Sequence, residues 1–428
     1  MLALEISRLE RRPADQHYSL TSTISTLTFL LMVLKFFDLR MWPHGYLEET
    51  VEPPLYSQAL TAIWILFFLA NLCINISTFV VVAKQNKLVF VYLFYCLLSS
   101  MFISTYPLTS MQFTMYYFAS AVTALIFVQN ASERVISISA ISLALYYLFF
   151  SALSMLYPTI SYMQGIHFGL FRGFAAHKND MGQHLVFIFL MMRCAEFKSA
   201  FWKWVLACGV VYLLFLSYSA QAIILFIMII LAYSTLKLLS FFDRSSSIAI
   251  LVILFIFTVA AVYADVQTTL FGELGKDENF SGRDVIWSFF SDEIARGNFF
   301  GYGLGVFFQD PVLHAQLVSY GIWWPISTAH SAYLEAVIAL GYIGGGLFFL
   351  VLLSAVSRIL GSMRANSRLQ TVGGLLVAVS LIGGITASEK LFTADFGWMS
   401  FMFGIALLNR YYFPVSAGRI PARSRERG

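Results

Sequence analysis

The stretch Ser331–Val356, SAYLEAVIALGYIGGGLFFLVLLSAV, decides the class of fold. Glu335 is its only charged residue, and it stands near the start. At about 1.5 Å of rise per residue, a helix of this length crosses the roughly 30 Å hydrocarbon core of a bilayer. The stretch therefore predicts a transmembrane helix.

Comparable apolar runs recur along the whole chain. Hydrophobic residues make up 59% of its 428 residues, charged residues only 12%, and the mean hydropathy is +0.76. Soluble domains carry about 25% charged residues, so one ordinary soluble core is excluded. We predict an all-α, polytopic transmembrane helix bundle of about 12 spans. The predicted spans are 21–38, 57–82, 88–104, 110–129, 135–155, 181–197, 201–217, 219–237, 247–264, 331–356, 371–388 and 394–412.

The distribution of lysine and arginine sets the expected orientation. With the N-terminus in the cytoplasm, 19 of the 27 basic residues fall in cytoplasmic segments, as the positive-inside rule requires. The polar segment 1–20 lacks a signal-peptide cleavage site, so the run after it is taken as the first span. We expect a cytoplasmic segment 1–20, nine spans over 21–264, a large outer loop over 265–330 that contains short helices, three spans over 331–412 and a basic cytoplasmic tail over 413–428.

Composition and motifs also exclude several functions. The four cysteines lie in apolar runs without metal-ligand spacing and are expected to be small buried hydrophobes. A net charge of +4 is too small to suggest nucleic acid, and the chain has no P-loop. No acidic cluster of the magnesium-binding type is evident, so we expect neither a metal nor a cofactor.

The outer loop contains the segment KDENFSGRDVIW, Lys276–Trp287. Ser281 can cap a helix, Gly282 permits a tight turn, and a helical pattern begins after them. A guanidinium at Arg283, beside free backbone N–H groups, suits a phosphate or diphosphate. The alternative is that Arg283 pairs with a neighbouring aspartate on a solvated loop.

Two further motifs flank the point where this loop re-enters the membrane. The run Gly301–Phe308, GYGLGVFF, lacks the spacing of a dinucleotide site. Its alternate glycines favour a structural turn, and the alternative is a close approach of the backbone to a ligand. His330 can bind a sugar hydroxyl and accept its proton near neutral pH, or it can simply cap a helix. Glu335 lies deeper, where an ionisable residue needs a partner.

A second group precedes the sixth predicted span, in the sequence RGFAAHKND, Arg172–Asp180. Arg172 and Lys178 stand on the outer side against the positive-inside bias, so an anionic ligand is one reason for their presence. Pairing with nearby carboxylates is the other. Glu389, on the same side, either balances these cations or forms a weak exposed pair with Lys390.

In combination, these motifs resemble the O-antigen ligase/polymerase superfamily, most closely its Wzy-type, ExoQ-like exopolysaccharide polymerases. The likeness covers roughly residues 100–390, in the family's order. Its residues are Ser104 and Pro107; Gly173, His177-Lys178-Asn179 and Gly182; Leu274-Gly275-Lys276-Asp277; Ser281-Gly282-Arg283 and Ile286-Trp287; Gly301-Tyr302-Gly303; His330, Tyr333-Leu334-Glu335 and Gly341; and Ser388-Glu389. One departure is that Ser217-Tyr218-Ser219 is followed by Ala220-Gln221, where the family commonly has Arg or Lys.

The resemblance implies a bacterial inner-membrane glycosyltransferase whose active site and large loop face the periplasm. Undecaprenyl-diphosphate-linked oligosaccharides would be its donor and acceptor, in contact with membrane lipids and with a chain-length regulator or export complex as a further partner. Arg172, Lys178 and Arg283 are expected to bind the diphosphate, Arg283 and His330 to act in catalysis, and His177, Asn179, Glu335, Glu389 and Trp287 to support them. Trp323 and Trp324, like Trp287, can stack on sugar rings.

Three alternatives remain open at this stage. The first is a ligase that transfers a finished glycan to lipid A-core, although the missing cation after Ser219 weakens that assignment. The second is a transporter or flippase of lipid-linked sugar, which usually shows inverted repeats and paired broken helices. The third is a non-catalytic assembly subunit.

Overall fold

The computed structural model describes residues 20–37, 55–163, 168–239, 246, 249–250, 283–297, 299–309, 311–322, 326, 328–362, 367–386, 391–392 and 396–412. Over these ranges the chain is helical, and its only β-pairing is an isolated bridge between Tyr162 and Phe171. The helices are α2 (Leu20–Phe36), α3 (Leu55–Ile74), α4 (Ile76–Gln85), α5 (Lys87–Phe102), α6 (Pro107–Asn130), α7 (Glu133–Ser154), α8 (Pro158–Ser161), α9 (Lys178–Cys194), α10 (Ala200–Leu216), α11 (Ala220–Leu239), α14 (Arg283–Ala295), η3 (Phe307–Gln309), α15 (Pro311–Ser319), α16 (Ala332–Ser362), α17 (Arg368–Thr386) and α18 (Phe396–Tyr412).

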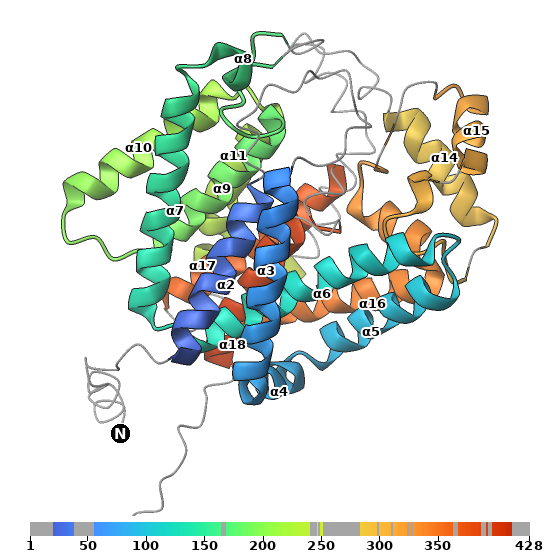
Figure 1. Cartoon of the computed structure of the whole chain (residues 1–428), viewed down its shortest axis with the longest axis horizontal. Coiled ribbons are helices and arrows are strands. Elements are labelled where there is room, and N and C mark those ends of the chain that lie inside the picture. The colour runs from blue at the N-terminus through green and yellow to red at the C-terminus, as the bar shows by residue number, and fades with distance from the viewer. Residues whose placement is uncertain are drawn as a thin grey trace, which may run out of the picture.

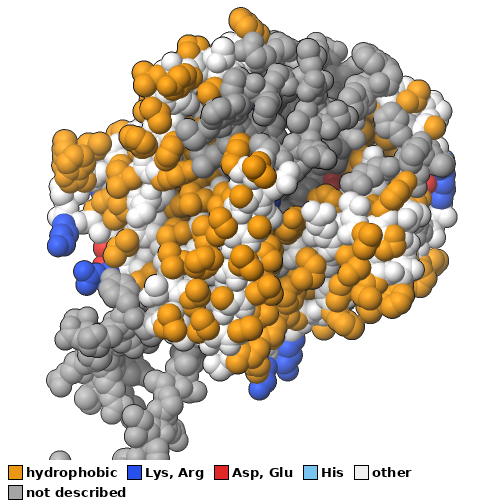
Figure 2. All heavy atoms as spheres, in the orientation of Figure 1, with side chains coloured by type: hydrophobic (Ala, Val, Ile, Leu, Met, Phe, Trp, Pro, Cys, Tyr) orange, Lys and Arg blue, Asp and Glu red, His pale blue; other side chains and the backbone are white. Residues whose placement is uncertain are grey.

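Five of the described helices are long and apolar enough to cross a membrane, namely α3, α6, α7, α16 and α17. The bent pair α4 and α5 passes the same test as one unit, while α2, α10 and the described start of α11 are apolar but shorter. Hydrophobic side chains cover most of the visible face of the bundle, and Lys and Arg appear at its margins (Figure 2). The chain is therefore an all-α protein with the surface of a membrane-embedded bundle.

The outermost helices support the same conclusion. In α3, only 17% of the membrane-length window is buried although the whole helix is apolar. Helix α10 lies outside α7 and α9 (Figure 1) and exposes aromatic side chains at both ends, Trp202 and Trp204 near its start and Tyr212 and Phe215 near its finish. Aromatic residues at both ends of a lipid-facing helix are typical of the two membrane–water interfaces.

One predicted span is wrong. The range 57–82 is two helices, because the chain breaks at Asn75 between α3 and α4. The amide of Asn75 binds Asn71 at 2.8 Å and accepts from Asn130 of α6 at 2.7 Å, and Ser25 of α2 joins the same network. These side chains bind one another where two helices end, although the amide nitrogen of Asn71 has no partner among the described residues. The apolar sequence around them concealed this network. Each other predicted span except 247–264, which lies almost wholly outside the described residues, overlaps one helix.

The next break defines one end of the bundle. Helices α4 and α5 meet at Asn86 with a bend of 101°. Arg358 of α16 donates to the side-chain oxygens of Asn86 at 2.7 Å and of Asn409 of α18 at 2.5 Å. Arg410 binds the carbonyl of Ala131 at 2.6 Å. We call this the arginine end.

Helix α17 begins at the arginine end as well. Arg368, its first residue, forms an ion pair with Glu196, just after α9, at 2.8 Å. The end of α9 therefore lies beside the start of α17. The arginine end therefore includes Arg358, Arg368 and Arg410. All three are predicted to be cytoplasmic.

Candidate functional site

The candidate site lies at the opposite end of the bundle, which we call the site end. Helices α9 and α17 pack together with the end of one beside the start of the other, so the start of α9 lies near the end of α17. The start of α16 lies there too, since the Tyr333 hydroxyl donates to the Leu381 carbonyl of α17 at 2.5 Å. The starts of α9 and α16, which carry most of the predicted site residues, therefore share one end of the molecule.

The first cluster, which we call the α9 group, consists of Arg172, His177, Lys178, Asn179 and Ser219. His177 caps α9, because its Nδ1 accepts from the backbone N–H of Asn179 at 3.1 Å. The Asn179 side-chain oxygen accepts from the Ser219 hydroxyl at 2.8 Å. Ser219 directly precedes α11, so the starts of two helices meet here. A helix start favours anions, and Lys178 is the first residue of α9.

Arg172 is held by the backbone around it. Its exposed fraction is 6%, its Nε donates to the Ile160 carbonyl at 2.9 Å, and an Nη1 hydrogen donates to the Ala176 carbonyl at 3.0 Å. These bonds join α8 to the segment before α9 and orient the guanidinium. Arg172 therefore organises the α9 group, and a diphosphate would meet a cation that is already positioned.

The second cluster, the α16 group, consists of Trp287, Ala329, His330 and Glu335. The indole N–H of Trp287 donates to the Ala329 carbonyl at 3.1 Å, and Glu335 accepts from the Ala329 N–H at 3.0 Å. His330 follows directly and has a φ of 52°, in the left-handed region that non-glycine residues rarely adopt. Two side chains thus hold both polar groups of the residue before His330 and keep this strained turn in place.

Glycines attach the loop to α16. Gly341 has a φ of 67° and interrupts α16, and the backbone N–H groups of Tyr302 and Gly303 donate to the Ala339 carbonyl at 3.0 and 2.8 Å. A Cβ on Gly301 would lie 2.4 Å from the Ala339 oxygen. The glycines of the GYG motif thus serve a turn with positive φ, as the structural interpretation predicted, and bring the loop against the backbone of α16. Helix α16 agrees with the predicted span 331–356 but is interrupted at Gly341.

The same crossing reaches α5 and α6. A Cβ on Gly303 would lie 2.5 Å from the Cβ of Ser104, and the Ser110 hydroxyl donates to the Leu304 carbonyl at 3.0 Å. The segment at Ser104 and the GYG segment, which are far apart in the sequence, are thus brought together. This contact fixes the loop against the beginning of α6.

The loop carries short helices, as predicted, and has a small core of its own. Helices α14 and α15 lie side by side at one edge of the molecule (Figure 1), and Phe289, Phe290 and Phe307 are among the buried residues between them and α16. Tyr302 donates to Glu293 at 3.1 Å, and Glu293 also pairs with Arg296. Tyr320 donates to Asp292 at 2.7 Å, and this hydrogen bond raises the pKa of the Tyr320 phenol.

Some predicted residues lie outside what the structure describes. Arg283 is the first residue of α14, so the predicted helix start is confirmed, but its side chain is outside the described part, as are Ser281 and Gly282. Glu389, Trp323 and Trp324 also lie outside it. Within the described residues, no three His, Cys, Asp or Glu side chains are grouped as metal ligands would be.

Comparison with protein-family models, curated proteins and solved structures gave no significant match.

One buried histidine near the site, His184, is not among the residues predicted from the sequence. This residue lies on α9 below the α9 group, is buried between Phe37 and Phe396, and contacts the Tyr147 hydroxyl through Nδ1 at 3.2 Å. A lone histidine in an apolar run resembles a core residue. Asp180 stands four residues earlier and therefore lies on the same face of the helix. This spacing was the one sequence feature that could have pointed to His184.

Proposed function

We propose that the protein is a membrane glycosyltransferase that joins lipid-diphosphate-linked oligosaccharide units into a longer chain, as the resemblance to the exopolysaccharide polymerases suggests. The observation that supports this best is the presence of the α9 group and the α16 group at the same end of the bundle. The first provides cations and helix starts for a diphosphate, and the second provides an imidazole in a constrained turn.

The donor would bind through its diphosphate at the start of α9. Lys178 and the oriented Arg172 would neutralise charge there, and Arg283 at the start of α14 would add a third cation. During transfer, the bond between the anomeric carbon and the diphosphate oxygen breaks, so negative charge grows on the leaving lipid diphosphate. Fixed cations stabilise this charge in the transition state.

The acceptor would bind near His330. Its attacking hydroxyl forms the new bond to the anomeric carbon and gives its proton to the His330 imidazole. Glu335 and Trp287 hold the turn that carries His330. The energy comes from the diphosphate ester of the donor, so the proposal needs no nucleotide and no metal ion.

The proposal includes a topology. About 12 spans, with both termini in the cytoplasm of a bacterium, would put the arginine end on the cytoplasmic side of the inner membrane and the site end in the periplasm. The lipid tail would then stay in the bilayer while the sugars extend over the 265–330 loop. A chain-length regulator or an export complex is a reasonable partner for such an enzyme.

The test is turnover of a purified, defined undecaprenyl-diphosphate oligosaccharide, with and without a chelator. Wild-type protein should form longer lipid-linked chains equally well in both. Arg283→Ala should abolish them and His330→Ala should reduce them severely, while both proteins remain expressed. Arg296→Ala is the matched control, because Arg296 directly follows the same helix, is more than half exposed, and pairs with Glu293.

Two results would contradict the proposal. Normal chain growth in Arg283→Ala would remove the cation from the mechanism, and unaltered turnover in His330→Ala would remove the base. In a deletion strain, single repeat units should accumulate. Unattached full-length polymer would instead indicate a ligase.

A further inference from the structure

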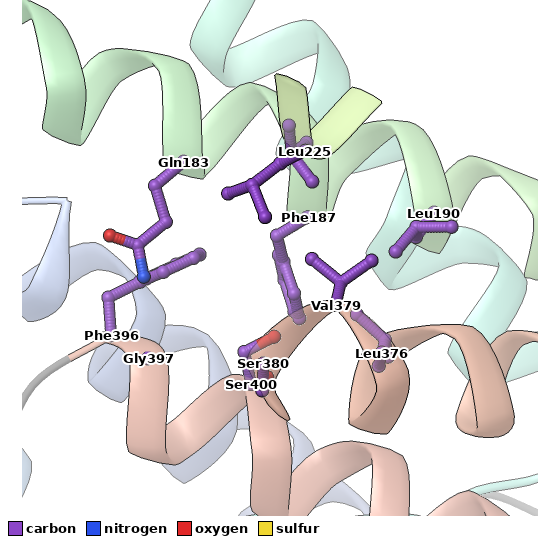
Figure 3. A pocket seen from close by; sticks show the side chains of 11 residues that line it. Gln183, Phe187, Leu190, Leu225, Leu376, Val379, Ser380, Phe396, Gly397 and Ser400 are labelled. Atoms are coloured by element: carbon purple, nitrogen blue, oxygen red, sulfur yellow. The ribbon is translucent and has the colours of Figure 1, made fainter. Parts of the chain in front are cut away.

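A cavity lies between α9, α11, α17 and α18, and its lining runs along α9 from Gln183 to Leu190 (Figure 3). Its empty volume is about 320 Å³, including the space at its mouth. Apolar side chains, among them Phe187, Leu225 and Phe396, form most of its walls. The cavity thus lies inside the helix bundle, below the α9 group.

Two serines make this cavity different from an ordinary packing defect. Ser380 of α17 and Ser400 of α18 both line it, their exposed fractions are 5% and 8%, and neither hydroxyl has a hydrogen-bond partner among the described residues. Figure 3 shows the two side chains next to each other. Two buried hydroxyls on different helices therefore face the same space without a protein partner.

Helix serines elsewhere in the described bundle fall into two groups. Ser120 donates to the Tyr117 carbonyl at 3.1 Å, a bond to the preceding turn that is common for a serine in an apolar environment. The hydroxyls of Ser99 and Ser151 are buried and have no hydrogen-bond partner among the described residues. Ser380 and Ser400 differ from both groups, because their unpaired hydroxyls line a cavity that can hold a molecule to bind them.

We infer that the cavity is a water-binding site. Leaving a hydroxyl unpaired in an apolar interior is unfavourable, and a buried water needs two to four polar partners. Ser380 and Ser400 provide two, and the Gln183 amide lines the same space. A hydrocarbon chain would leave both hydroxyls unpaired.

The water site gives the two halves of the α17–α18 contact different packing. Towards the arginine end, Gly373 and Gly404 bring the backbones so close that a Cβ on Gly373 would lie 2.8 Å from the Gly404 carbonyl oxygen. Towards the site end, these helices and α9 enclose the water site, and Phe396 of α18 packs on Phe187 of α9 with ring centroids 5.0 Å apart. Helix α9, which carries His177 and Asn179, is thus supported partly by exchangeable solvent. This inference does not depend on the proposed glycosyl transfer.

The first test measures thiol chemistry in the cavity. In full-length protein with the exposed Cys73 and Cys208 replaced by Ala, Ser400→Cys is treated with methyl methanethiosulfonate and compared with Ser120→Cys. Only the thiolate reacts, and a hydrated thiol ionises more readily than a dry one. A pKa difference of one unit makes the Ser400→Cys reaction about ten-fold faster. Equal rates would overturn the inference.

The second test uses the sign of a stability change. If the hydroxyls bind water, Ser380→Ala and Ser400→Ala each remove a hydrogen bond and should lower Tm by roughly 1–2 °C. If the cavity is dry or holds a lipid chain, each substitution removes an unpaired polar group and Tm should rise. A rise in both variants would refute the water site.

Discussion

The α9 group and the loop crossing at Gly301 and Gly341 are assembled in different ways. In the α9 group, side chains make the bonds, because Arg172 donates to the carbonyls of Ile160 and Ala176 and the Ser219 hydroxyl donates to the Asn179 side chain. At the crossing, backbone packs directly on backbone, because Gly301 and Gly341 let the loop cross α16 without any Cβ between them. The α9 group can therefore be weakened one bond at a time, whereas the crossing depends on the absence of single atoms.

The largest effect should come from adding one such atom. Gly301→Ala combines a φ of 79° with a Cβ only 2.4 Å from a backbone oxygen, so we expect a loss of more than about 4 kcal/mol and little folded protein. Gly297→Ala is the control, because Gly297 has a φ of 87° but open space around it and should lose only about 1 kcal/mol. Size-exclusion profiles and Tm of the two variants measure the difference. Similar losses would show that the crossing is not closely packed.

Next in size is the removal of Arg172. Arg172→Ala leaves two partly buried carbonyls without their charged donor, which should cost about 2–3 kcal/mol and lower Tm in the absence of any ligand. Lys178→Ala should change stability by less than about 0.5 kcal/mol, because Lys178 is a partly exposed residue at a helix start. Equal stability of the two variants would mean that Arg172 does not organise the α9 group.

The turn that carries His330 should be more tolerant. Glu335→Gln keeps an oxygen for the Ala329 N–H and should retain most stability, whereas Glu335→Ala should lose about 1–3 kcal/mol. Trp287→Phe removes the hydrogen bond to the Ala329 carbonyl, on the residue whose N–H is bound by Glu335. The effects of Trp287→Phe and Glu335→Ala on the free energy of unfolding should therefore be coupled in a double-mutant cycle. If the turn positions His330, kcat should fall more than KM rises, and the pH dependence of kcat should change. Additive effects with an unchanged pH profile would separate the turn from catalysis.

The smallest effect is expected at the junction of α9 and α11. Ser219→Ala removes one hydrogen bond to Asn179, which should cost about 1 kcal/mol. A Tm measurement on the purified protein detects a change of this size. A loss of stability as large as that of Arg172→Ala would mean that the contacts of the α9 group do not contribute independently.

The sequence predicted the elements better than their interruptions. Apolar runs located most helices, and the residue types Ser281-Gly282 correctly predicted that a helix starts at Arg283. The breaks at Asn75 and Gly341 were missed because each lies within a continuous apolar run. A glycine or asparagine there looks like an ordinary helical residue until a partner from elsewhere in the chain binds the freed backbone.

The candidate site was predictable only in part. Trp287, His330 and Glu335 were expected near one another and are joined through Ala329. The bonds of Arg172 to two backbone carbonyls were not predictable. Every residue type has a backbone carbonyl, so the sequence does not show which carbonyls will lie near a given side chain. His184 was overlooked for the opposite reason, since its surroundings are aromatic rings contributed by distant helices.

The interruption of α16 has a consequence for ion coordination. Unwound segments of membrane helices are useful to transporters because their carbonyl oxygens can replace the hydration shell of a cation. Here the two oxygens at the interruption are occupied, that of Ala339 by Tyr302 and Gly303 and that of Leu340 by the Tyr95 hydroxyl at 3.0 Å. A sodium ion arriving at this depth would have to displace the protein's own loop.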